Sequence, residues 1–332
     1  MYPSTKVFNP LLAGLIPDGF SKTSFAGGII LQGAGDNHGM FEGLEEFGLQ
    51  NIENKPLYQD EDDEKEKHPG PASEKNNEAK YLFDSEVGCP VCNSRVTVKR
   101  IRRSALRLVS RDTDSMPHYQ DINPLFYEIW ICNNCGYAAT QSSFTQPLTQ
   151  AEAELIRQHI SSKWRPKQYP PFYDAHIAVE RFKLALVSAT VRKARPIDIA
   201  MLCLKMGWVY RTMEDTDNEI KCLNQALIGL KSAYDKGPFP AAGMDESTLA
   251  FLIGELSRRV GNYQEALHYL GRVITDRTAK SALKEKARDQ RQLIINAQRA
   301  SQSEAAKTQD TPDSTSKTSP PKGLKRLFSK NK

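Results

Sequence analysis

The pattern of apolar and polar positions predicts short strands in the first half of the chain. Val96, Val98 and Ile101 alternate loosely with basic residues, and a period of two is typical of β-strands. A second apolar run, from Phe126 to Ile131, leads directly into a pair of cysteines. We therefore expect a β-hairpin or a three-stranded ribbon within a module at residues 81–147.

From about residue 148 the apolar positions follow the spacing of amphipathic helices instead. Thr149 followed by Glu152 is typical of a capping box at a helix start. Seven helices of similar character are expected in residues 148–300, and small residues at Gly207 and Gly254 indicate helix pairs with tetratricopeptide-like spacing. These glycines lie 47 positions apart, whereas the repeat is about 34 residues long, so an insertion between the pairs is expected.

The two ends of the chain, residues 1–80 and 301–332, are predicted to be mostly disordered, because little of either follows a helical or strand period; one short helix is expected around Met40 to Leu49. Residues 41–66 carry ten acidic side chains against two lysines, whereas the tail carries seven basic and three acidic ones. The net charge of +5 therefore conceals an acidic leader and a basic tail. The end of the tail, PKGLKRLFSKNK, is compatible with weak peripheral contact to an anionic membrane, and a solubilising role is the simpler interpretation.

Four of the six cysteines form two C-x-x-C pairs, Cys89 with Cys92 and Cys132 with Cys135. Each tight turn aims two sulfurs at one point, and two such turns supply the tetrahedral ligand set of a structural zinc site. Because 39 residues separate the pairs, the strands must bring them together. Iron in a rubredoxin-like site and a redox-active dithiol remain alternatives. Four cysteine ligands leave no open coordination position, so hydrolytic chemistry at this metal is not expected.

The remaining cysteines, Cys203 and Cys222, lie within helical patterns and are predicted to be buried thiols. A chain with free thiols and a metal site suits a reducing compartment. The start of the chain lacks the pattern of a signal peptide, and the apolar stretch FAGGIILQGAG is too short and too rich in glycine to span a bilayer. A cytoplasmic protein without a transmembrane segment is therefore expected.

Two sets of side chains between the cysteine pairs are candidates for further chemistry. Carboxylates and a histidine form a candidate polar site that could hold a second metal or act as acid and base, although Asp-rich turns are also common hairpin connectors: Asp112, Asp114, His118 and Asn123. Seven cations within 17 residues, with no acid among them, form a candidate anion or nucleic-acid strip: Arg95, Lys99, Arg100, Arg102, Arg103, Arg107 and Arg111. The simpler interpretation of this basic strip is a solvated strand face.

The order of these motifs resembles the bacterial domain-of-unknown-function family DUF2225. The similar segments are CPVC, a basic stretch ending in RDTD, NPLFYEIWICNNCGYAA with Phe144 after it, ERFKLAL and LKMGWVYR, over about Ser85 to Arg299. The resemblance implies a cysteine-knuckle module fused to tetratricopeptide-like helices, and it implies no established activity. It carries over the four knuckle cysteines and a polar block made of Asp112, Asp114, Asn123 and Pro124. The leader and the tail lie outside it.

Together these patterns predict a mainly helical α+β protein, with a small zinc-ribbon-like β module followed by a tetratricopeptide-like α-solenoid. Closed metal sites stabilise a fold, and helical repeats present extended binding surfaces. We therefore expect a non-enzymatic, zinc-bound adaptor whose helices bind a protein or peptide. The alternatives are a nucleic-acid-binding protein that uses the basic strip and a metal-dependent enzyme that uses Asp112, Asp114 and His118.

Overall fold

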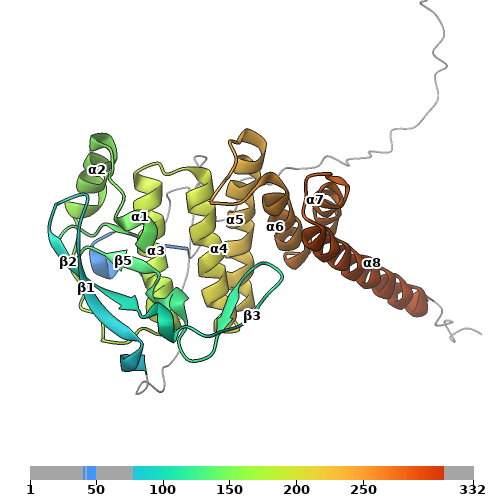
Figure 1. The fold of residues 1–332 in the computed structure, drawn as a ribbon, viewed down its shortest axis with the longest axis horizontal. Coiled ribbons are helices and arrows are strands. Elements are labelled where there is room, and N and C mark those ends of the chain that lie inside the picture. The colour runs from blue at the N-terminus through green and yellow to red at the C-terminus, as the bar shows by residue number, and fades with distance from the viewer. Residues whose placement is uncertain (1–39, 42, 50–77, 310–332) are drawn as a thin grey trace, which may run out of the picture. The chain divides into compact units, whose positions relative to one another are not determined.

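The computed structural model describes residues 40–41, 43–49 and 78–309, all within one structural unit (Figure 1). Short strands occupy the first part of this range and long helices the second. The mainly helical α+β class predicted from the sequence is therefore confirmed. Among the described residues, no helix combines the length and apolar character needed to cross a bilayer.

Three antiparallel hairpins form the β part of the structure. They pair β1 (Leu82–Gly88) with β2 (Arg95–Ile101), β3 (Leu108–Arg111) with β4 (Pro117–Tyr119), and β5 (Ile129–Ile131) with β6 (Ala138–Thr140). The first and third hairpins each enclose one C-x-x-C pair, because the knuckle itself reverses the chain: the Asn93 N–H donates to the Cys89 carbonyl and the Gly136 N–H to the Cys132 carbonyl. The sequence predicts either a β-hairpin or a three-stranded ribbon with knuckles at its ends. The structure instead has three separate two-stranded hairpins in the described range, and the knuckles lie at the turns of the first and the third.

Eight α-helices are assigned in the described range. They are α1 (Gln141–Phe144), α2 (Gln150–Ile156), α3 (Ala175–Val191), α4 (Pro196–Thr212), α5 (Thr216–Lys236), α6 (Glu246–Arg259), α7 (Tyr263–Thr275) and α8 (Ser281–Gln309). A π-helical turn, η5 (Arg157–Ser161), extends α2, and short 3-10 turns include η1 (Glu45–Phe47), η2 (Glu78–Lys80), η3 (Arg103–Ala105) and η4 (Pro124–Tyr127). From α3 to α8, each helix packs against the next (Figure 1).

Polar caps fix where several of these helices begin. Thr149 and Glu152 make both hydrogen bonds of the capping box at α2 that the sequence predicts. The side chains of Asp174, Asp215 and Asp245 each accept a backbone N–H in the first turn of α3, α5 and α6. Since an uncapped helix end leaves such N–H groups without partners, these residues fix the position at which each helix begins.

The helices and the cysteine hairpins share one continuous hydrophobic core. The buried cluster runs from Tyr137 and Phe144 to Phe182 on α3, and on to the later helices. Arg181, on the same helix, is buried: its guanidinium donates to the Ile129 carbonyl and lies over the rings of Tyr169 and Tyr173, at 4.8 and 4.4 Å from their centres. Buried side chains from before and after residue 147, the predicted boundary of the cysteine module, therefore pack together and join the hairpins to α3.

Part of the predicted leader is packed into this core. Met40, Phe41, Leu44, Phe47 and Leu49 are all buried, and the Phe47 ring stacks on Trp164 at 5.3 Å. The Arg165 N–H donates to the Phe47 carbonyl. The short helix predicted around Met40 to Leu49 corresponds to the 3-10 turn η1, whereas its burial in the core differs from the solvated leader that the sequence predicts. The reason is that these apolar side chains lie among acidic residues, so that the average polarity of the segment conceals them. At the other end, α8 continues to Gln309, so residues 301–309 of the predicted disordered tail are helical. Residues 1–39, 42, 50–77 and 310–332 lie outside the described range, and with them the expectations for most of the leader and for the rest of the tail.

Two glycines in the helices allow a direct test of packing. A Cβ on Gly254 of α6 would lie 2.9 Å from Leu270 Cγ, whereas a Cβ on Gly271 of α7 would meet nothing within 4 Å. Alanine is favoured over glycine inside a helix by about 1 kcal/mol, and overpacking costs about 1–3 kcal/mol. We expect Gly271→Ala to raise the free energy of unfolding and Gly254→Ala to lower it, as measured by urea denaturation. Equal effects of the two changes would contradict close packing of α6 on α7.

Candidate metal centre and its attachment to the helices

The four knuckle cysteines lie close together in the structure. Their sulfur atoms are all within 4.8 Å of one another, with Cys89 Sγ 3.6 Å from Cys135 Sγ and Cys92 Sγ 3.6 Å from Cys132 Sγ. Zinc–sulfur bonds of about 2.3 Å in a tetrahedron place sulfurs about 3.8 Å apart. The donor set and its dimensions therefore fit a four-coordinate metal ion, and this cluster could hold one.

Mutual hydrogen bonds dominate the protonation of these thiols. Hydrogen bonds from Cys135 and Cys89 lower the pKa of Cys132 to about 2, whereas the hydrogen bond with Cys132 raises the pKa of Cys89 to about 12. The pKa of Cys135 is also raised, first of all by Cys132. Burial by itself would raise the pKa of Cys92, yet hydrogen bonds with Ser94 and Asn134 lower this pKa as well. A bound metal cation would hold all four sulfurs as thiolates.

The turn after α2 holds both knuckles by their backbone. Arg157 donates to the Val91 carbonyl at 3.0 Å and Ser161 to the Cys135 carbonyl at 2.8 Å. The Trp164 indole N–H donates to the Asn133 carbonyl at 2.8 Å. Gly136 has a φ of +75°, and a Cβ there would lie 2.6 Å from the Trp164 ring, so glycine is required by both conformation and space. Contacts of this kind orient metal ligands from outside the coordination sphere.

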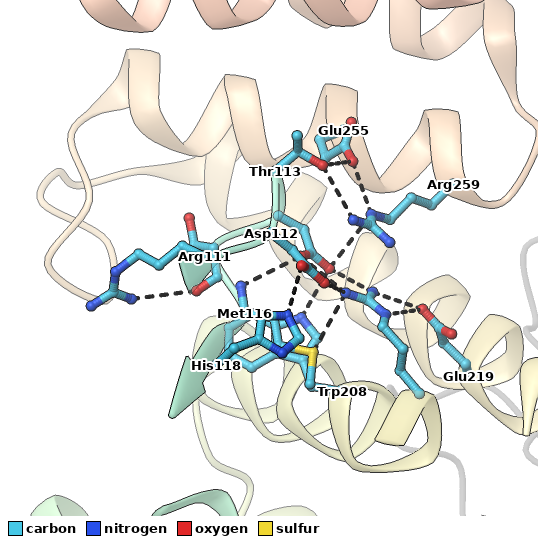
Figure 2. Close-up of polar contacts among 12 residues, drawn as sticks. Arg111, Asp112, Thr113, Met116, His118, Trp208, Glu219, Glu255 and Arg259 are labelled. Atoms are coloured by element: carbon cyan, nitrogen blue, oxygen red, sulfur yellow. Dashed lines mark hydrogen bonds and ion pairs between the residues drawn. The ribbon is translucent and has the colours of Figure 1, made fainter. Parts of the chain in front are cut away.

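The RDTD turn between β3 and β4 fixes the second hairpin to the helices. Figure 2 shows Asp112 and Thr113 directed toward side chains of the helical part. Arg211 on α4 donates to Asp112 Oδ2 at 2.7 Å, to Asp114 Oδ2 at 2.7 Å and to Glu219 of α5 at 2.8 Å. The Thr113 hydroxyl donates to Glu255 of α6. One four-residue turn therefore contacts side chains of α4 and α6, and Arg211 links it to Glu219 of α5.

Asp114 is the most deeply buried charged group of this turn, with 0% of its surface exposed. Burial by itself would raise its pKa, yet the hydrogen bonds and charge of Arg211, the charge of Arg259 and the Trp208 N–H hold the pKa below its ordinary value. Trp208 donates to Asp114 Oδ2 at 2.9 Å. The pKa of Arg211 is raised in turn, although burial opposes this, because Asp114 and Glu219 stabilise its charge. Asp114 therefore remains ionised inside the protein.

The other predicted members of the polar site have different surroundings. His118 lies with Nε2 2.7 Å from Asp112 Oδ1, so these two side chains do come together beside Asp114. Asn123 is engaged elsewhere, where its side chain accepts the Leu125 N–H and caps η4. The sequence did not single out Arg211, which organises this cluster. The only local indication in the sequence is the segment LKMGWVYR, where Trp208 and Arg211 lie one helical turn apart and can therefore reach the same buried carboxylate.

The predicted basic strip divides into an engaged half and an open half. Arg95 pairs with Glu86 and Lys99 with Asp84 on the neighbouring strand, while Arg100 lies over the Trp130 ring at 4.8 Å and Arg102 over the Phe83 ring at 5.3 Å. The second half comprises Arg103, Arg107 and Arg111, all exposed and without a carboxylate partner among the described residues. Of the seven cations in the predicted strip, three are therefore exposed without a carboxylate or an aromatic ring as partner among the described residues.

The fold and the site together define a mainly helical protein with a four-cysteine candidate metal centre. The chain belongs to the family described as "Uncharacterized protein conserved in bacteria (DUF2225)", whose model matches residues 82–294. The resemblance predicted from the motifs is thereby confirmed over nearly the same range. No curated protein and no solved structure matches the chain.

Proposed function

We propose that this protein is a non-enzymatic, zinc-bound adaptor that binds a protein or peptide partner. The closed set of four cysteines supports a structural role for the zinc ion, because it leaves no position for a substrate. Two polar residues that an enzyme could use support the same view: Asp114 is buried against Arg211 and Trp208, and Asn123 caps a helical turn. Asp114 thus attaches the β3–β4 hairpin to α4, and Asn123 stabilises η4.

The observation that carries the proposal is the exposed apolar surface of β3. The large apolar side chains that are exposed within the described residues are Phe83, Leu108, Val109, Ile220 and Leu293, and only Leu108 and Val109 are adjacent. They are 48% and 67% exposed, and they belong to a two-stranded sheet in which β3 pairs with β4 alone. The RDTD turn fixes this hairpin to α4 and α6, which holds the hairpin in place on the helices.

The chemistry of the β3 edge indicates what kind of partner it suits. An unpaired strand edge offers backbone N–H and C=O groups to an incoming extended peptide. Arg103, Arg107 and Arg111 are exposed nearby in the sequence. The partner we expect is therefore an extended segment with apolar and acidic residues. This places the proposed binding surface on the hairpin rather than on a concave face of the helices, which is the surface that the repeat pattern favours.

A photoreactive amino acid at position 109 tests the proposal in the protein's own cell, with position 293 as a matched control on α8. We expect a specific crosslinked partner from position 109 alone. Leu108→Asp with Val109→Asp should weaken binding of that partner more than ten-fold, because about 2 kcal/mol of apolar contact is lost, whereas Leu293→Asp should leave it unchanged. Equal crosslinking from both positions, or full binding by the double variant, would remove the β3 edge from the proposal.

A second candidate function, nucleic-acid binding, is favoured by the three open cations of the basic strip. This function is tested by measuring binding to RNA or DNA at increasing salt concentration. Binding should weaken with salt and be lost when Arg103, Arg107 and Arg111 are all replaced by glutamine. Glutamine at Lys284, Lys286 and Arg291 of α8 is the matched control, since it removes the same charge from another exposed surface. Binding that is insensitive to salt would argue against phosphate recognition.

A further inference from the structure

A pocket lies where the third hairpin meets the first long helices. Its volume is about 420 Å³, within the usual size range of small-molecule sites. The walls come from β6, α1, α3 and α4, with one residue from the connection between α5 and α6: Ala138, Ala139, Thr140, Ser142, Ser143, Ala185, Ala189, Arg192, Arg195, Asp198, Met201, Leu202, Lys205 and Ala242. Neither the four-cysteine cluster nor the β3 edge takes part in it.

The walls of this pocket differ in chemistry from one side to the other. Small side chains line it from β6 and α3, where four alanines leave room for a flat apolar body. Hydroxyl groups of Thr140, Ser142 and Ser143 line it beside them. Three cations and one carboxylate also line it, and Arg195 donates through two nitrogens to that carboxylate, Asp198. Such a combination of an apolar surface with a few polar groups is typical of sites for small organic molecules.

The cations retain unused hydrogen-bonding capacity. Arg192 uses one nitrogen, NH1, to bind Glu152 at 2.9 Å, and Lys205 donates to Glu128 at 2.5 Å. A guanidinium has five N–H donors and an ammonium has three. These two carboxylates formally balance the charges of Arg192 and Lys205 while they hold both side chains in place. The remaining donors are available to an incoming oxyanion, and their side chains are already ordered.

We propose that this pocket binds a small organic anion, with a carboxylate or phosphate group held by Arg192 and Lys205 and a planar or apolar body against the alanines. This goes beyond the adaptor role, because the ligand is a small molecule and its site is separate from the partner surface. The walls belong both to the cysteine hairpin and to α3 and α4, so a bound anion would also tie these parts together. Its binding should therefore raise the thermal unfolding midpoint of the full chain.

The fluorescent probe 1-anilinonaphthalene-8-sulfonate, which joins an anionic group to a flat apolar body, tests the site on the folded full-length protein. We expect saturable binding that benzoate or phenyl phosphate displaces; which of the two competes better tells a carboxylate ligand from a phosphate ligand. Ala189→Leu, which fills the pocket, should weaken binding at least ten-fold. Ala79→Leu adds the same side chain on an exposed turn and should leave binding unchanged.

Lys205→Gln provides a second variant, which nearly keeps the size of the side chain and removes its charge. It tests the proposed anion site even if Ala189→Leu does not fold. We expect it to weaken probe binding and to abolish the rise in the unfolding midpoint caused by the competing anion. Equal binding by Ala189→Leu and Ala79→Leu would overturn the proposed site. Displacement by neither anion, or unchanged binding by Lys205→Gln, would overturn the proposed ligand class.

Discussion

Replacing Cys132 with serine is expected to remove the metal and unfold the cysteine hairpins. Structural zinc contributes an apparent 10–16 kcal/mol in small metal modules, which is about as large as the whole stability of many domains. The short β1–β2 and β5–β6 hairpins contribute little burial by themselves. Elemental analysis should find one zinc per chain in the wild type and close to none in Cys132→Ser, with a lower thermal unfolding midpoint and a loss of near-ultraviolet circular dichroism.

Cys222→Ala is the matched control, because it removes a buried thiol of α5 that is not part of the cluster. We expect it to keep a full metal content. Visible absorption separates the candidate metals, since iron bound by four thiolates is coloured and zinc is not. Full metal retention by Cys132→Ser would contradict the ligand set, and a coloured wild-type protein would replace zinc with iron.

Arg211→Met should destabilise the protein by about 3–5 kcal/mol, because it removes the main partner of the buried Asp114 carboxylate and leaves only Arg259, 3.6 Å away, and the Trp208 N–H beside it. The expected loss is far larger than for Arg95→Met, whose partner is on the surface: the Arg95 side chain is 85% exposed, and such pairs contribute about 1 kcal/mol or less. Urea denaturation of both variants measures the difference. Similar losses for the two would contradict the central position of Arg211.

The pH dependence of this loss follows from the pKa of Asp114. In the wild type this pKa is lowered, so its contribution to stability is present above about pH 4 and is lost as the pH falls through the folded value. Without Arg211 the buried carboxyl should instead have a raised pKa, and the variant should gain stability on acidification. The gap between wild type and Arg211→Met should therefore narrow as the pH falls. Adding Asp114→Asn to Arg211→Met should recover part of the stability, since no buried charge remains.

The local rules of the sequence predict much of this fold. Capping at Thr149 and Glu152, a helix that starts at Pro196 and glycines at positions 207 and 254 all act within a few residues of their effect, and the structure places helices there. The approach of the two C-x-x-C pairs is also predictable, because one pair supplies only two of the four ligands that a tetrahedral metal site needs. In each case the residue type carries the structural information by itself.

Long-range contacts between polar residues could not be predicted in the same way. Asp114 and Arg211 are 97 positions apart, and nothing in either local segment identifies the other as its partner. An Asp-rich turn is usually solvated, whereas Asp114 of this one is buried because α4 and α6 contribute side chains that contact the turn. The burial of the short leader segment at residues 43–49 could not be predicted for a related reason, since its partners Trp164 and Arg165 follow more than a hundred residues later.

That separation has a consequence for how the chain folds during synthesis. Phe47 leaves the ribosome 118 residues before Arg165, which it contacts through a backbone hydrogen bond. At about 5–20 residues per second, this interval amounts to about 6–24 s. The apolar side chains of the leader have no place to dock until α2 and the turn after it have emerged. The first described segment of the protein therefore reaches its final position only after both cysteine knuckles and α2 have been synthesised.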